Sequence, residues 1–177
     1  MKNIKYILTF LLFIFYLNPV YSQAKIATLD VFKLLKDSKA AISITEQLNA
    51  VAKKYEGQGQ EKQKTIQKQE EELLRQKSTL TPEAFLDRKN TFEKKVIEFN
   101  KDTQTKRKNI TVARKKAIEE VEKEVEIILK KIIETDKITA VIKKTSIVLS
   151  EDSIDITQKV IDELDKKLSS VKVNITP

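Results

Sequence analysis

The side chains that most often carry catalysis are nearly absent from this chain. It has no histidine, no cysteine and only two glycines, Gly57 and Gly59. Catalytic dyads and zinc sites generally need histidine or cysteine, and a phosphate-cradling loop needs several glycines. The abundant carboxylates lie among lysines in polar stretches, without a pocket of convergent polar groups. The sequence therefore predicts no enzyme, no cofactor and no metal site.

The remaining residue types suit binding rather than bond chemistry. A basic set could attract acidic chains, although a solvated helix face is the simpler interpretation of such charges. Three phenylalanines recur every seven residues and so share one helical stripe. The rings either form a seam between two helices, which we favour, or grip an apolar partner. The basic set is Lys94, Lys95, Lys106, Arg107 and Lys108, and the rings are Phe85, Phe92 and Phe99.

Two long helices must position these side chains. Between residues 40 and 133 apolar residues recur every three or four positions, with a break at 78–82. There Thr81 suits an N-cap and Pro82 a first helical residue. The sequence thus predicts an antiparallel helical-hairpin (coiled-coil) arm over 41–133 with its tip at about 78–82. Its expected seam comprises Leu48, Val51, Tyr55, Ile66, Leu73 and Leu80, then Phe92, Val96, Phe99, Thr103, Lys106, Ile110, Ala113, Ala117, Val121, Val125, Ile128 and Ile132.

Gly57 and Gly59 lie inside the first helix, where each costs about 1 kcal/mol relative to alanine. Residues whose numbers sum to about 160 should face each other in such a hairpin. The glycines then lie opposite residues 100–105, which are also poor in apolar side chains. Weak packing on both sides predicts a hinge. The alternative is that the glycines are neutral surface substitutions in a helix held straight by its flanks.

Residues 1–22 have the pattern of a secretory signal cleaved near Ser22. Lys2 and Lys5 precede an apolar run over 6–17 and a break at 18–19. A membrane anchor is the weaker interpretation, because the run is shorter than the roughly 20 residues that cross a bilayer. Of the 34 Lys and Arg side chains only these two lie in the signal. The exported chain keeps 32 basic and 26 acidic side chains, a net charge of about +6.

The flanks of the arm predict a small β body over 23–40 and 134–177, built from both ends of the chain. Runs at 25–31, 138–142 and 146–150 are β-prone, and the last two should form a hairpin. Asp155 and Thr157 should start a short final helix, followed by a polar tail over 171–177. The fold class is α+β, mostly α. So small a core is marginal alone and should oligomerise, through Ile26, Leu29, Val31, Val141, Ile147 and Leu149.

The order of these segments resembles a known family. The export signal, the runs at 25–31 and 35–41, the charged hairpin and the closing segments at 147–150 and 155–160 are similar to the Skp/OmpH family of periplasmic chaperones for outer-membrane proteins. The resemblance implies a periplasmic, jellyfish-shaped homotrimer whose three arms enclose an unfolded outer-membrane protein without ATP. The family gives no sharp binding site to carry over, and we expect the client contacts on the basic set and the three phenylalanines. Contact with the membrane surface is left open.

Two other functions stay open on the sequence. A coiled-coil spacer or adaptor of the cell envelope would have the same arm and differ only in its partner. A nucleic-acid binder would explain the basic charge, but it needs a one-sided basic stripe, whereas acidic residues are interspersed here. The export signal also argues against it, so no specific nucleic acid is expected as a partner.

Overall fold

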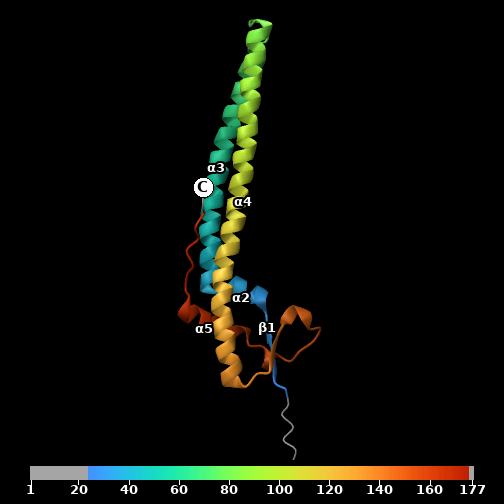
Figure 1. The fold of residues 1–177 in the computed structure, drawn as a ribbon, viewed down its shortest axis with the longest axis vertical. Coiled ribbons are helices and arrows are strands. Elements are labelled where there is room, and N and C mark those ends of the chain that lie inside the picture. The colour runs from blue at the N-terminus through green and yellow to red at the C-terminus, as the bar shows by residue number, and fades with distance from the viewer. Residues whose placement is uncertain (1–23, 176–177) are drawn as a thin grey trace, which may run out of the picture.

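The computed structural model describes residues 24–175, so the predicted signal at 1–22 lies outside the described residues. Figure 1 shows two long helices that rise from a base of shorter elements. In chain order the elements are β1 (Ile26–Leu29), α2 (Val31–Asp37), α3 (Lys39–Gln76), α4 (Pro82–Asp136), β2 (Ala140–Lys143), the 3-10 turns η1 (Lys144–Ser146) and η2 (Asp152–Ile154), and α5 (Thr157–Lys167).

Helices α3 and α4 lie side by side and are joined by residues 77–81 (Figure 1). The Thr81 hydroxyl accepts a hydrogen bond from the Ala84 N–H at 3.3 Å, and Pro82 is the first helical residue. The predicted N-cap and helix start are therefore confirmed. At about 1.5 Å per residue, the 38 residues of α3 extend roughly 57 Å. The longer α4 continues past the start of α3 into the base.

Polar contacts between α3 and α4 give the register of the pair. Lys62 Nζ lies 3.0 Å from Asp102 Oδ2, and Lys95 Nζ donates to Gln69 Oε1 at 3.4 Å. Both pairs of residue numbers sum to 164, one helical turn from the expected sum of about 160. Each residue of the predicted seam is buried or half-buried, as a seam between the two helices requires.

The depth of burial changes along the seam. On α3 the seam is buried only at Leu48, and on α4 it is buried from Ala113 onward, where Val121 is fully buried. No residue between 49 and 112 is buried. We call residues 49–112 the distal pair, and residues 24–48 with 113–175 the base. The hydrophobic core lies entirely in the base.

β1 and β2 form a parallel sheet of two strands, in which Ile26 pairs with Ala140 and Leu29 with Lys143. Strands from both flanks of the helical pair therefore meet, as expected. The predicted β-hairpin between 138–142 and 146–150 is wrong. The chain leaves β2 through the single 3-10 turn η1, and residues 147–150 form no strand. Val148 and Leu149 are 105% and 90% exposed.

Residues beyond 150 explain why no hairpin forms. Asp155 bridges to Thr28, and the Ile156 N–H donates to the Thr28 carbonyl at 3.0 Å. The Asp155 carboxylate also accepts from Lys144 Nζ at 2.6 Å. Both ends of the intervening segment are thus tied to the same place. The segment bulges outward as a loop instead of folding back along β2.

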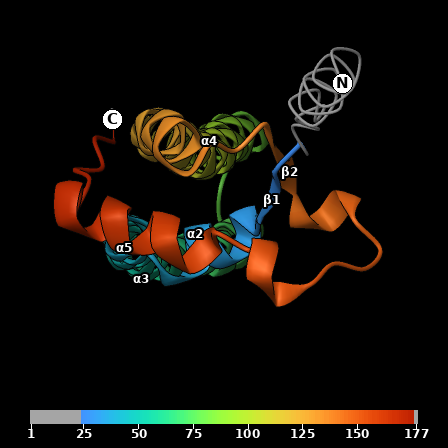
Figure 2. The ribbon, with the colours of Figure 1, turned by 90° about the horizontal axis from the view of Figure 1, so that it is seen from below.

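Helix α5 closes the base. Asp155 Oδ1 accepts from the Thr157 N–H at 2.8 Å, which confirms the predicted helix start. Asp165 Oδ1 accepts from the Lys39 N–H at 2.8 Å, so a carboxylate of α5 caps the first turn of α3. Seen from below, α5 lies beside α2 and α3, across from α4 (Figure 2). Its buried face comprises Thr157, Val160, Ile161 and Leu164.

Residues 171–175 are not the polar tail that the sequence predicted, and we call this segment the strap. Val171 is 3% exposed and belongs to the core, while Val173 and Ile175 are half-buried against it. In an extended chain alternate side chains point to opposite sides. Lys172 and Asn174 therefore stay exposed. The prediction was wrong because the apolar residues of this short segment alternate with polar ones.

Candidate binding surface of the distal pair

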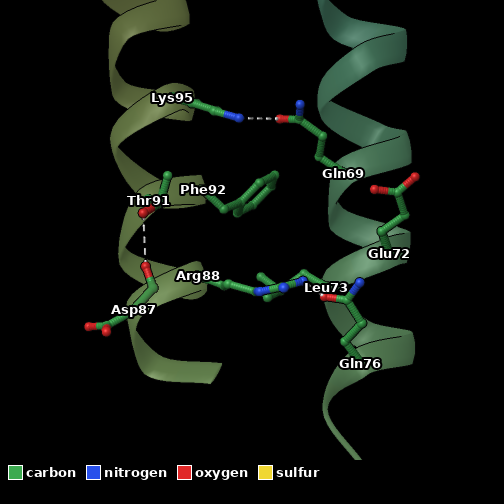
Figure 3. Close-up of a pocket in the computed structure, with 9 residues that line it drawn as sticks. All are labelled: Gln69, Glu72, Leu73, Gln76, Asp87, Arg88, Thr91, Phe92 and Lys95. Carbon is green, nitrogen blue, oxygen red and sulfur yellow. Dashed lines mark hydrogen bonds between the residues drawn. The ribbon is translucent and has the colours of Figure 1, made fainter. Parts of the chain in front are cut away.

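The distal pair holds most of the residues that the sequence singled out for binding. Phe85, Phe92 and Phe99 are all half-buried on the seam side of α4. Figure 3 shows Phe92 pointing toward α3, between Gln69 and Leu73, in an open hollow of about 370 Å³. Phe92 thus lies between the two helices, and Phe99 lines a second hollow together with residues of α3, while part of each ring stays accessible.

The predicted basic set is divided by the helix geometry. Lys95 Nζ turns toward α3 and donates to Gln69 Oε1 at 3.4 Å (Figure 3). Lys106 also turns inward: its Nζ lies 5.2 Å from the centroid of the Tyr55 ring and donates to Gln58 Oε1 at 3.4 Å. Both ammonium groups therefore contact α3, although the Lys95 side chain stays exposed and that of Lys106 is half-buried.

A polar cluster replaces apolar packing halfway along the pair. Asp102 Oδ2 lies 3.0 Å from both Lys62 Nζ and Lys106 Nζ. The hydrogen bonds from Lys106 and Lys62 hold the pKa of the Asp102 carboxyl below its ordinary value. These residues line a hollow of about 440 Å³, and Gly59 and Arg107 line it as well. The two helices are thus joined at this height by charge rather than by apolar contact.

The two glycines lie beside this cluster, within an uninterrupted α3. A Cβ atom added at either Gly57 or Gly59 would meet nothing within 4 Å. No close packing therefore requires glycine at these positions. The hinge stays a prediction.

The other side of α4 carries exposed apolar residues that the sequence interpretation passed over. Leu86 and Ile97 are 54% and 65% exposed, and Lys94 and Lys108 are also exposed. A spacing of eleven residues is close to three helical turns, so 86, 97 and 108 lie on one line, opposite the seam. We call this line with its neighbours the outer stripe: Leu86, Asn90, Lys94, Ile97, Lys101 and Lys108. The eleven-residue spacing was the signal that could have revealed it.

On α3, Leu74 is 62% exposed near the tip. The distal pair therefore presents apolar side chains on both helices, separated by lysines. Such a surface can contact apolar and acidic segments of another chain at the same time.

The predicted oligomerisation residues are also divided. Leu29 is buried in the core, and together with the half-buried Val31 and Val141 it lines an apolar hollow of about 320 Å³ in the base. Ile147 is half-buried, and Ile26 and Leu149 are 42% and 90% exposed. The base also exposes Phe32 (75%) and Val148 (105%).

Residues 24–175 contain no cluster of three or more His, Cys, Asp or Glu side chains that could hold a metal ion. Over the same range, every helix is too short or too polar to span a membrane.

Comparisons with known proteins give a family from one match and a fold from another. The model of the family described as outer membrane protein (OmpH-like) matches residues 25–164. A crystal structure from Caulobacter crescentus CB15, described as an outer membrane chaperone (OmpH-like), superimposes with a TM-score of 0.79 at 14% identity. The match covers 88% of this chain and 92% of that one, and at this identity it speaks for the fold alone. No curated protein matches the chain.

Proposed function

The chain belongs to the OmpH-like family of outer membrane proteins, and on that premise we propose that it is a chaperone that holds unfolded outer-membrane β-barrel proteins without ATP. The observation that carries the proposal is the distal pair. It projects from the core, has no buried residue of its own, and exposes Leu74, Leu86 and Ile97 among lysines.

Unfolded barrel chains expose alternating apolar residues and unpaired strands while they cross water, and so they aggregate. Leu86 and Ile97 offer contacts for such apolar residues, and Lys94 and Lys108 attract acidic ones. Each contact is weak, so a client can be held and remain mobile. Release needs no nucleotide, because folding into the membrane removes the client. The predicted signal at 1–22 fits a periplasmic location.

We further propose that three copies assemble through the base, so that their distal pairs enclose the client. β2 is hydrogen-bonded to β1 along one edge, and its other edge has no strand partner within residues 24–175. Open edges and exposed apolar residues invite a further chain. Phe32, Val148 and Leu149 are exposed apolar residues of the same base. Closure by a ring of copies would cover both features.

The test is the dilution of a urea-unfolded outer-membrane barrel protein into buffer with and without the mature protein. Light scattering should fall as the protein approaches one trimer per client, and sedimentation equilibrium should give the trimer mass. Unchanged scattering at a stoichiometric trimer would contradict the chaperone proposal. It would favour the coiled-coil spacer or adaptor, which has the same helices and no need for an unfolded partner.

A further inference from the structure

We propose that the strap occupies an exchangeable binding site for an extended polypeptide whose apolar and polar residues alternate. The strap is the resident occupant, and an extended segment of an unfolded client is its competitor. The identity of this competitor rests on the proposed chaperone function, whereas the existence of the site does not. We call the surface of the base that contacts residues 171–175 the strap site.

The side-chain amide of Gln47, on α3, binds the backbone of the strap through both its nitrogen and its oxygen. Its Nε2 donates to the Val171 carbonyl at 2.7 Å, and its Oε1 accepts from the Val173 N–H at 3.0 Å. One residue of a parallel β-strand likewise bonds to the carbonyl and the N–H of residues two apart. Gln47 thus acts as a strand partner supplied by a side chain. Because both bonds go to backbone atoms, they accept any extended segment.

The side chains of the strap add a pattern to this backbone recognition. Val171, Val173 and Ile175 pack against the core, and Lys172 and Asn174 face solvent. The strap site therefore fits apolar residues at every second position. Strands of outer-membrane barrels have this same alternation. The strap thus has the same alternation of apolar and polar residues as the unfolded barrel proteins that we propose as clients.

The attachment of the strap suits exchange. Within residues 24–175 no main-chain hydrogen bond joins the strap to another element, so Gln47 and apolar contacts hold it. Segments held in this way open at a lower free energy than helices packed in a core. The strap runs upward beside α3 from the end of α5 toward the distal pair (Figure 1). A client held by the distal pair would reach the strap site without leaving the protein.

The first experiment keeps the strap native and follows its mobility. Because the chain has no cysteine, Asn174→Cys accepts a single nitroxide label at an exposed position. The label should be restricted in the protein alone and become mobile when a urea-unfolded outer-membrane barrel protein is bound. Gln47→Ala should mobilise it without a client. A control label at Lys130→Cys, on an exposed α4 side chain, should not change. A label at 174 that stays restricted in the client complex overturns the exchange.

The second experiment measures the site with a fluorescent peptide of residues 170–175. In the variant Val171→Ser, Val173→Ser, Ile175→Ser the strap loses its apolar contacts and Gln47 is kept. This variant should bind the peptide at least about tenfold more tightly than the intact chain, since a resident occupant lowers the competent fraction. Adding Gln47→Ala should remove the gain. A peptide of equal composition with its three apolar residues in a block should show no gain.

Equal peptide affinity for the intact chain and a triple variant of unchanged helicity would overturn the site. If the triple variant loses helicity, the label at position 174 decides alone. The two proposals fail separately. A peptide gain without suppression of client aggregation keeps the strap site and rejects the chaperone function. If aggregation is suppressed but the label at position 174 stays restricted, the chaperone function is kept and the exchange at the strap site is rejected.

Discussion

The base and the distal pair share the same two helices but differ in what holds those helices together. In the base, the seam of α4 is buried from Ala113 to Ile132, and α5, β1 and the strap add to the core. In the distal pair the seam is only half-buried, and Asp102 with its two lysines replaces apolar packing halfway along. The base therefore supplies the stability, which leaves the distal pair free to expose apolar residues for binding.

The largest effect is expected when isoleucine is replaced by alanine in the base, and the same replacement in the distal pair provides the comparison. Ile128→Ala, at a base residue that is 2% exposed, should lower the free energy of unfolding by about 2 to 5 kcal/mol. Ile66→Ala, at a half-buried seam residue of the distal pair, should cost clearly less because water already reaches it. Urea unfolding followed by circular dichroism measures both. Equal costs would remove the distinction between the regions.

A second comparison uses one aspartate from each region. Burial tends to raise the pKa of Asp155, but hydrogen bonds from Lys144 and Thr157 outweigh it and hold the pKa below the ordinary value of 3.8. Since the folded pKa is the lower one, the stabilisation is complete above the unfolded pKa and is lost as the pH falls through the folded value. Asp155→Asn should cost about 1 to 3 kcal/mol at neutral pH and flatten the acid side of the stability curve.

Asp102→Asn is the matched control, because the pKa of Asp102 is also lowered by lysines but the group lies in the exposed distal pair. Its effect should be smaller and should fade as salt is added. Urea unfolding midpoints of both variants are measured from about pH 7 down to about pH 3, a range that includes the ordinary aspartate pKa of about 3.9. A larger loss of stability for Asp102→Asn than for Asp155→Asn would contradict this prediction, because the stronger ion pair would then lie in the distal pair.

The smallest effect concerns the proposed hinge. Gly57→Ala with Gly59→Ala should add about 1 kcal/mol per site to helix stability, because the added methyl groups meet nothing. Amide hydrogen exchange should slow over residues 55–65 and stay the same in the base. Unchanged exchange over 55–65 would reject the hinge and leave the glycines as neutral surface residues.

Local signals allowed much of the fold to be predicted from the sequence. Apolar spacing of three and four gave the seam, because the same face of a helix recurs at that period. The Thr81 cap and the Asp155 start of α5 were predictable because each depends on residues within three positions.

The sequence predicted that strands from both flanks meet, but it did not reveal which segments pair. The partner of β2 is β1, more than 100 residues earlier, and Asp155 rather than the run at 146–150 lies beside Thr28. The strap is seated by Gln47, which lies 124 positions before Val171. No local pattern reveals either pairing.

The candidate binding residues were only partly predictable. Closeness in sequence grouped Lys94 with Lys95 and Lys106 with Lys108, whereas the helix turns one member of each group toward α3 and the other toward solvent. The exposed Leu86 and Ile97 were not predicted, because apolar spacing of three and four identifies only the seam and these two residues lie on the opposite face of α4.

Removal of the apolar part of the outer stripe tests most directly whether the distal pair holds the client. Leu86→Ser with Ile97→Ser changes two exposed side chains, so unfolding should shift by no more than about 0.5 kcal/mol per site. The matched control is Ile127→Ser, which is 53% exposed on α4 in the base. The stripe variant should lose most of its suppression of barrel-protein aggregation, while the control keeps it. Full suppression by a folded stripe variant would contradict the claim that the distal pair holds the client.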